Sequence, residues 1–176
     1  VQKEGAHMLQ RLSRLVNGGG VKVPHHKDTA NFPTEYLPVP PKVILPMNQH
    51  VGAPCEPCVK KGDKVWVGTM VGRATAKVSM HIYSSVSGTV IAVEPILYNF
   101  GKAETVVVIE TDGAQTPDPA ICPPEVTDLA SFIAALENSG IVGLGGAGFP
   151  TDVKVMPKNL AEIDTLLING AECEPY

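Results

Sequence analysis

Four glycines within six positions, just before a proline, constrain the end of this chain more than any other feature. They are Gly143, Gly145, Gly146 and Gly148. Because glycine has no Cβ, such a loop can adopt positive φ and bring its backbone close to a ligand. Pro150 suits the first position of a helix, and the N–H groups of a glycine turn and of a helix N-terminus attract anions. The stretch Gly143–Lys154 therefore predicts a phosphate-binding turn before a short helix, or else a closely packed turn without a ligand.

A short apolar run follows the glycine-rich loop and ends in a polar cluster. Leu166-Leu167-Ile168-Asn169 predicts a buried strand, and the chain continues through Gly170-Ala171-Glu172-Cys173-Glu174-Pro175-Tyr176. Open α/β sheets bind their ligands at the carboxyl ends of the strands. We therefore expect the loop and the polar cluster to contribute to one site.

These two segments, in this order and at this separation, resemble the flavin and NADH site of the RnfC family, the C-type subunits of the Rnf electron transport complex. They are also similar, more distantly, to the NADH-binding flavoprotein subunit of respiratory complex I, where the loop usually reads Gly-Arg-Gly-Gly-Ala-Gly-Phe-Pro-Thr-Gly-x-Lys. Leu144 stands where that pattern has Arg, Asp152 where it has its last Gly, and Ala171 where the strand end has Asp.

The resemblance implies a set of cofactor-binding residues. The four glycines would pack against FMN and NADH, Lys154 would place a cation near the flavin, and Phe149 would cover part of NADH. Asn169 would hydrogen-bond FMN, while Glu172, with Glu174 as a further candidate, would accept hydrogen bonds from NADH. The structural alternatives are a surface lysine, a core phenylalanine and solvated loop acids.

The resemblance also implies an activity. An oxidoreductase of this family passes electrons between NADH and ferredoxin through FMN and [4Fe–4S] clusters, coupled to ion movement by membrane subunits. In the family the cluster-binding cysteines lie beyond the position of Tyr176, so we expect this chain to be a fragment without a full catalytic cycle. Its expected partners are other subunits of the complex, NADH and, indirectly, ferredoxin, at the cytoplasmic face of the membrane.

The middle of the chain has the pattern of short strands joined by turns. Strands are predicted at Lys42–Pro46, on both sides of a turn within Val59–Val71, at Ser85–Val93 with a glycine kink, and at Val106–Ile109. Two half-motifs, Val59–Gly68 and Ser87–Val90, resemble the halves of a barrel-sandwich hybrid, the fold of biotinyl and lipoyl carrier domains. The predicted fold class is therefore α+β in two parts, a β-rich hybrid domain followed by the beginning of an α/β flavin domain.

We divide the chain accordingly. Residues 1–35 form an N-terminal segment, of which 1–7 resemble an expression-tag remnant, and residues 36–113 form the hybrid domain. A proline-rich linker at 114–126 leads to the α/β part at 127–176. There, Leu129, Phe132, Ile133 and Leu136 have helical spacing. Thr127 or Asp128 can cap this helix and Gly140 can end it, and a second helix should run from Pro150 to about Met156.

The hybrid fold supplies a rival function. Carrier domains present a modifiable lysine between their two halves, and Lys77 falls near that position, although Ala76-Lys77-Val78 lacks the sequence that modifying ligases read. The alternative function is therefore a scaffold, carrier or docking module without cofactor chemistry, in which Lys77 is a solvated turn residue.

Two further patterns invite a metal interpretation. Cys55 and Cys58 have the spacing of a zinc or iron–sulfur half-site, but no second pair completes it, and only His50 could be recruited. We expect packed or free thiols there, and a solvated loop at His25 and His26. Our prediction is that the chain holds no metal.

Composition excludes some classes of function. A net charge of −4 and a pI near 5.7 argue against a nucleic-acid surface. There is no apolar run near the roughly 18 residues that span a bilayer, so we expect membrane attachment through partners. Four unpatterned cysteines favour a reducing, cytoplasmic setting.

Overall fold

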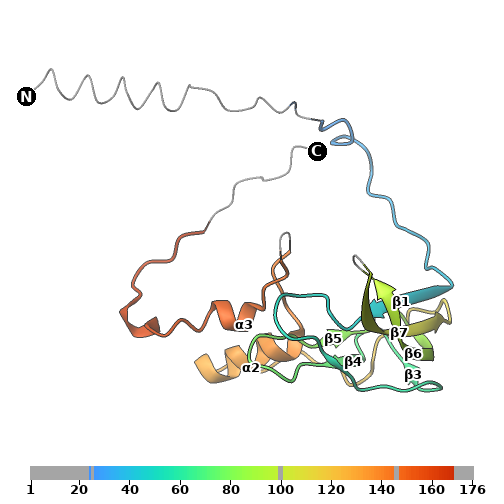
Figure 1. The fold of residues 1–176 in the computed structure, drawn as a ribbon. Coiled ribbons are helices and arrows are strands. Elements are labelled where there is room, and N and C mark those ends of the chain that lie inside the picture. The colour runs from blue at the N-terminus through green and yellow to red at the C-terminus, as the bar shows by residue number, and fades with distance from the viewer. Residues whose placement is uncertain (1–23, 25, 99–100, 145–146, 169–176) are drawn as a thin grey trace, which may run out of the picture. The chain divides into compact units, whose positions relative to one another are not determined.

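The computed structural model describes residues 24, 26–98, 101–144 and 147–168. Contacts group Leu37–Asp164 into one compact unit and assign the remaining residues to a second unit (Figure 1). In the described residues of the second unit there is a turn at 28–31 and no helix or strand. The elements described below all belong to the first unit.

Two antiparallel sheets form the β part of this unit (Figure 1). The four-stranded sheet has the order β1-β7-β6-β3, and the three-stranded sheet has the order β2-β4-β5. The strands are β1 Lys42–Pro46, β2 Glu56–Pro57, β3 Lys64–Val65, β4 Met70–Arg73, β5 Ile82–Tyr83, β6 Gly88–Tyr98 and β7 Lys102–Thr111. β1 has the predicted bounds, and the predicted Ser85–Val93 and Val106–Ile109 regions fall within β6 and β7 except for 85–87. Within Val59–Val71, strands follow the turn as β3 and β4, but none precedes it, because β2 ends at Pro57.

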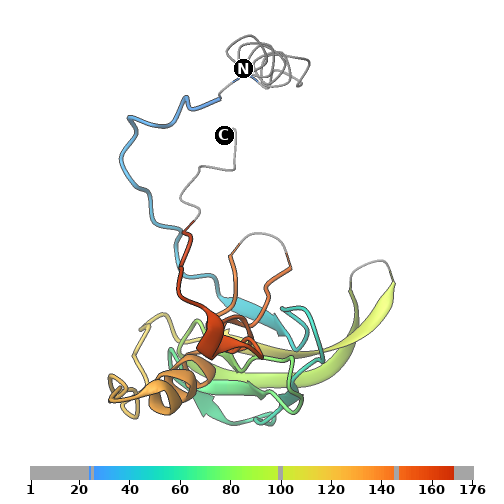
Figure 2. The same ribbon diagram turned by 90° about the vertical axis from the view of Figure 1, so that its left-hand side faces the viewer.

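The long hairpin of β6 and β7 exceeds the prediction, which ended the first strand at Val93 and began the second at Val106 (Figure 2). Pairing continues through Pro95↔Thr105 to Tyr98↔Lys102. The sequence did not predict this extension because Glu94-Pro95 is typical of a strand end. Residues 94–98 stay extended because each of them pairs with a residue of β7.

The two half-motifs of the hybrid domain pair with each other. Lys64 lies opposite Thr89, and Val65 lies opposite Gly88. A Cβ at Gly88 would come within 2.0 Å of the carbonyl oxygen of Glu110, so only glycine fits this crossing. The glycine at this position is thus required by the close approach of β6 to β7, while the register of the pair shifts between Val90 and Ala92.

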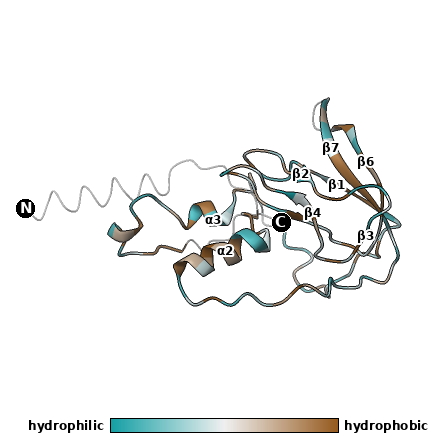
Figure 3. Ribbon diagram, turned by 90° about the horizontal axis from the view of Figure 1, so that it is seen from below, coloured by the Kyte–Doolittle hydropathy of each residue, from teal (hydrophilic) through white to brown (hydrophobic). Residues whose placement is uncertain are grey.

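The core lies between the two sheets. Val71 and Ile82 come from the three-stranded sheet, and Val90, Val107 and Ile109 from the four-stranded sheet, all in one buried cluster. Apolar residues run along both strands of the long hairpin (Figure 3). In β7 the four residues 106–109 are all buried, which explains why this central strand reads as a continuous apolar run rather than an alternating one.

The proline-rich segment at 114–126 is fastened to the β sheets along part of its length. The backbone N–H of Val67 donates to Thr116 O at 3.0 Å, and the N–H of Asp118 donates back to Val67 O at 2.9 Å. The Thr69 hydroxyl donates to the Asp118 carboxylate at 2.5 Å. This connection therefore packs on the domain that precedes it.

The predicted helices are present. Helix α2, Leu129–Ser139, begins at Asp128, whose carboxylate accepts the N–H of Ser131, and it ends at Gly140 with φ of 67°. Pro150 immediately precedes α3, Thr151–Lys154, and a short 3₁₀ helix, η1, spans Leu160–Glu162. Capping residues thus identified both ends of α2 correctly. Helix α3 is shorter than the predicted Pro150 to Met156, because Pro150 has a non-helical ψ of 129° and the helix ends at Lys154.

The predicted buried strand at Leu166–Ile168 is wrong for this structure. The three residues have no strand conformation, and their exposed fractions are 84%, 89% and 82%. A strand is stabilised by its neighbours, and no described residue pairs with this segment. The apolar face of α2 is likewise half exposed, with Leu129 at 50% and Phe132 at 41%.

Among the described residues, no helix is both long and apolar enough to cross a bilayer.

Candidate functional site

The glycine-rich loop is closed at its base by backbone pairing. The N–H of Gly143 donates to Phe149 O at 2.9 Å, and the N–H of Thr151 donates to Ile141 O at 3.1 Å. Between them, Val142 and Pro150 form an antiparallel bridge. The chain therefore enters and leaves the loop side by side, which holds its two ends in register.

The loop is docked on the β part of the unit. The N–H of Val51 donates to Ala147 O at 2.9 Å. Gly148 has φ of +62°, and a Cβ on it would lie 3.2 Å from Gln49 O and 3.3 Å from His50 Cα. Glycine is favoured here both by the left-handed backbone conformation and by the tight packing that a Cβ would meet. Part of the glycine pattern is thus explained by packing within the protein.

An open hollow of about 590 Å³ lies where the loop meets the segment 48–51. Its lining includes Gly143, Leu144, Ala147 and Gly148 from the loop. Leu144 is 97% exposed at its rim. The loop therefore presents backbone and small side chains to an accessible surface.

Lys154 from α3 brings a cation to the base of the loop. Its Nζ lies 2.6 Å from the position that a Cβ on Gly143 would occupy. Any side chain at Gly143 would displace the ammonium group, so these two predicted residues depend on each other. Lys154 itself is exposed, and its charge is accessible to a ligand at the loop.

Phe149 is not a core residue. Its side chain is 38% exposed, and its carbonyl oxygen accepts the hydrogen bond that closes the loop. The structure thus brings together Gly143, Gly148, Phe149 and Lys154. The other predicted site residues, Gly145, Gly146, Asn169, Glu172 and Glu174, lie outside the described residues.

A buried histidine supports the platform on which the loop rests. His50 is 8% exposed, and its Nε2 accepts the N–H of Met80 at 3.2 Å. Its Nδ1 must then carry the proton and donates to Val51 O at 3.2 Å. Val51 in turn holds Ala147. Sequence reasoning considered His50 only as a metal ligand, and no sequence signal distinguishes this positioning role.

The two cysteines of the predicted half-site are free thiols. Cys55 is buried and donates to Met80 O at 2.9 Å, whereas Cys58 is exposed and donates to Met70 O at 3.3 Å. Loss of solvation raises the pKa of both thiols. Within the described ranges no group of three or more His, Cys, Asp or Glu side chains could hold a metal. His25 lies outside the described residues.

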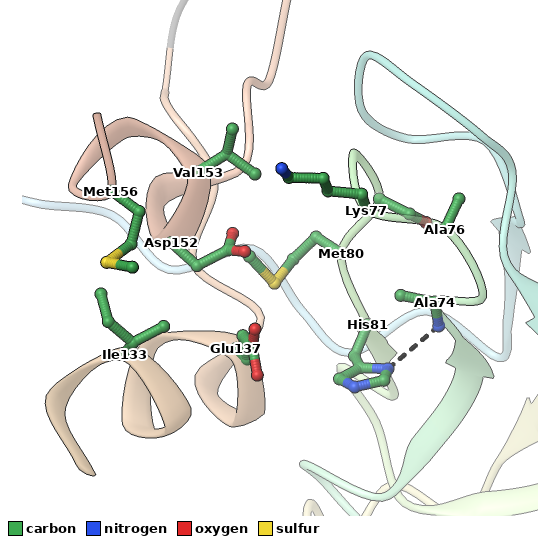
Figure 4. A pocket seen from close by; sticks show the side chains of 11 residues that line it. Ala74, Ala76, Lys77, Met80, His81, Ile133, Glu137, Asp152, Val153 and Met156 are labelled. Atoms are coloured by element: carbon green, nitrogen blue, oxygen red, sulfur yellow. Dashed lines mark hydrogen bonds between the residues drawn. The ribbon is translucent and has the colours of Figure 1, made fainter. Parts of the chain in front are cut away.

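Lys77 lies on the connection between β4 and β5, where a carrier lysine would stand. Its side chain points toward α3 and lines a hollow with residues of α2 and α3 (Figure 4). A carrier lysine must extend freely from its hairpin to meet other enzymes. Lys77 is exposed on this connection, as expected both of a solvated turn residue and of a carrier lysine.

Comparison with known families matches the β part and the C-terminal part of the chain to two different families. The family described as the RnfC barrel sandwich hybrid domain matches residues 16–114. The family described as the Nuo51 FMN-binding domain matches residues 136–176, which include α3 and the glycine-rich loop. The predicted barrel-sandwich hybrid, followed by the beginning of an FMN-binding domain, is confirmed.

Curated relatives agree with these matches. The chain is 46% identical over 162 residues to the C-type subunit of the Na⁺-translocating ferredoxin:NAD⁺ oxidoreductase complex of Acetobacterium woodii, covering 90% of this chain and 37% of the relative. It is 40% identical over 154 residues to the C-type subunit of the proton-translocating ferredoxin:NAD⁺ oxidoreductase complex of Clostridium ljungdahlii, covering 85% and 34%.

A third relative is the C-type subunit of the ion-translocating oxidoreductase complex of Pseudomonas aeruginosa, 35% identical over 163 residues, which cover 90% of this chain and 21% of the relative. The chain thus spans little more than a third of these curated relatives at most. The RnfC hybrid domain match covers more than half of the chain. The chain therefore belongs to the RnfC family.

Proposed function

We propose that this chain forms the N-terminal part of an RnfC protein that passes electrons between NADH and ferredoxin, coupled to ion translocation. The observation that carries the proposal is the Lys154 ammonium group at the base of the glycine-rich loop, inside the segment that matches an FMN-binding domain. The names of the relatives support the redox partners, ferredoxin and NAD⁺.

The loop fits FMN in three respects. Gly143 and Gly148 expose backbone to the hollow of about 590 Å³, the hollow is open to solvent, and Lys154 at the base of the loop offers a positive charge to a phosphate or flavin ring. When bound, FMN would supply hydride and single-electron chemistry that protein side chains lack. The chain's own residues would hold and orient it: Lys154 by charge, and the loop by backbone N–H groups.

The remaining roles follow from the family resemblance. Gly145 and Gly146 would continue the cradle, and Phe149 would lie against NADH with its exposed ring surface. Asn169 would hydrogen-bond FMN, and Glu172 and Glu174 would accept hydrogen bonds from NADH. We propose no catalytic side chain in this segment.

The other expected components complete the proposal. [4Fe–4S] clusters would be held by cysteines in the part of the family sequence that follows the FMN-binding segment. The protein would work at the cytoplasmic face of the membrane as a peripheral member of the complex, with ferredoxin as an indirect partner.

The test is an anaerobic titration with FMN and then NADH, using a version of the chain extended to the length of its relatives. The wild type should bind FMN tightly and bleach when NADH is added. Lys154→Ala should weaken FMN binding about tenfold or more, because a charge-assisted hydrogen bond is lost. Gly143→Val should weaken binding to a similar extent, because its side chain would push the Lys154 ammonium group from its position.

The matched control is Lys158→Ala, which removes an exposed lysine outside the loop. It should bind FMN like the wild type. Equal FMN affinity in the wild type, Lys154→Ala and Gly143→Val would refute the loop as the cofactor cradle.

A further inference from the structure

A second hollow of about 450 Å³ lies between the β4–β5 connection and the helices α2 and α3 (Figure 4). Its lining shares no residue with the hollow beside the glycine-rich loop. The proposed cofactor chemistry does not use it. Its chemistry is set by two carboxylates, one lysine and an apolar wall.

Asp152 is the unusual member of this lining. The residue is only 9% exposed, and its Oδ1 is fully buried without a hydrogen-bond partner. The carboxylate points from α3 toward Met80, into the hollow (Figure 4). Buried carboxylate oxygens nearly always have a partner, because an unpaired one carries a large desolvation cost. A donor that reached this oxygen from the hollow would remove that cost.

The surrounding groups make the hollow negative on balance. Glu137 on α2 adds a second carboxylate below Asp152, while Lys77 adds one ammonium group across the opening (Figure 4). His81 uses Nδ1 to accept the N–H of Ala74 at 3.0 Å, which leaves its proton on Nε2. Burial, and then the charge of Arg73, lower the pKa of His81, so this ring is neutral at pH 7.

Apolar side chains form the rest of the wall. Met80 is 2% exposed, and Ile133, Val153 and Met156 line the hollow from the helical side. This combination suits a cationic head on an alkyl stem, because the stem packs on the apolar wall while its N–H groups meet the carboxylates.

We propose that this hollow binds a primary ammonium or guanidinium group on a short alkyl stem, with Asp152 as its main partner and Glu137 as its second. Lys77 is the competing internal cation. The same chemistry belongs to a free alkylamine and to a lysine or arginine side chain of a neighbouring protein. The experiment separates these two sources.

The test is an NMR titration of the 176-residue chain with butylammonium, butylguanidinium and the capped peptide acetyl-Gly-Arg-Gly-amide. Binding should shift the amide signals of Met80, Ile133 and Val153. Asp152→Asn should weaken binding about tenfold or more, and Lys77→Met should strengthen it several-fold by removing the competing charge. Glu125→Gln, on the exposed proline-rich segment, should leave the affinity unchanged.

Saturation by the alkyl probes alone identifies a small amine as the ligand, and saturation by the peptide identifies a protein side chain. Equal affinity of Asp152→Asn and wild type for every probe overturns the proposal, and so does the absence of shifts with all three.

Thermal unfolding without ligand gives a second readout. Asp152→Asn should raise Tm, because a neutral amide costs less to bury unpaired. A lower Tm would show that Asp152 is already paired inside the chain, which also overturns the proposal.

Discussion

Gly148 and His50 connect the glycine-rich loop to the β sheets. His50 orients the backbone of Val51, Val51 binds Ala147, and Gly148 passes within van der Waals contact of Gln49. The loop is therefore placed by contacts that lie about a hundred residues away in the sequence. These few side chains and backbone groups therefore determine where the loop lies.

Gly148→Ala should destabilise the unit by about 1–3 kcal/mol, because alanine adds both a left-handed strain and a crowded methyl group. The matched control is Gly113→Ala, whose φ is +74° but whose Cβ would meet no atom within 4 Å. Urea denaturation of both variants measures the difference in free energy of unfolding. Equal losses would mean that the loop does not pack on Gln49 and His50 as described.

His81 makes stability depend on pH. Its burial, aided by the charge of Arg73 and opposed by Glu137, lowers its pKa from the usual 6.5. The unfolded chain therefore takes up this proton at a higher pH than the folded chain. The stability contributed by neutral His81 is complete above about pH 6.5 and is lost as the pH falls through the lower folded pKa. His81→Gln should lose less stability than the wild type between pH 7.5 and 5.5 in chemical denaturation, and parallel curves would contradict this account.

Strand β7 contributes four consecutive buried residues, 106–109. It is an inner strand of its sheet, with β1 on one side and β6 on the other. Ile109 is fully buried on this strand, while Ile44 on the neighbouring β1 is 47% exposed. The two isoleucines thus share a residue type and a sheet but differ in burial. A comparison of alanine variants at these two positions therefore measures how much burial between the two sheets contributes to the free energy of unfolding.

Ile109→Ala should cost about 2–5 kcal/mol of unfolding free energy, since it leaves a cavity in the cluster between the sheets. Ile44→Ala should cost less than about 1 kcal/mol, because half of its side chain already contacts water. Guanidinium denaturation with matched m-values tests the pair. Similar losses for both variants would place the core elsewhere.

For the chain as a whole, the helical region and the β sheets belong to one compact unit. The Tyr83 hydroxyl donates to Asn138 O at 2.5 Å, and Gly140 packs against the Tyr83 ring. In contrast, Leu166–Ile168 remain exposed, although their sequence is that of a buried strand. The helical region thus packs against the β sheets, whereas Leu166–Ile168 have no strand partner among the described residues.

Extension of the chain to the length of its relatives should convert Leu166–Ile168 into a protected strand. Additional strands would supply the missing backbone partners and cover the apolar side chains. Amide hydrogen exchange should then slow at Leu167 and Ile168 in the extended version by about a hundredfold or more relative to this chain. Unchanged exchange would refute the assignment of this segment to a sheet.

The features that the sequence predicted well depend on near neighbours. Asp128 and Gly140 define the ends of α2 because caps act within one turn of the helix, and the apolar run 106–109 identified the central strand. Gly143 and Lys154 lie close together in the structure, while their shared role at a cofactor site is a prediction from the family pattern.

The remaining features depend on distant contacts. β6 continues past Pro95 because β7 pairs with it. The glycine-rich loop packs on a segment that the hydrogen bond of His50 orients. The buried oxygen of Asp152 lies beside a hollow lined by α2, α3 and the β4–β5 connection. Local propensity carries no information about such neighbours. Contacts between residues that are distant in the sequence form only when the chain closes long loops and water is removed from between the elements, so the free energy of these contacts is not encoded locally. Short-range rules therefore located the helices, strands and glycines, whereas long-range packing set which of their side chains are buried, paired or available to a ligand.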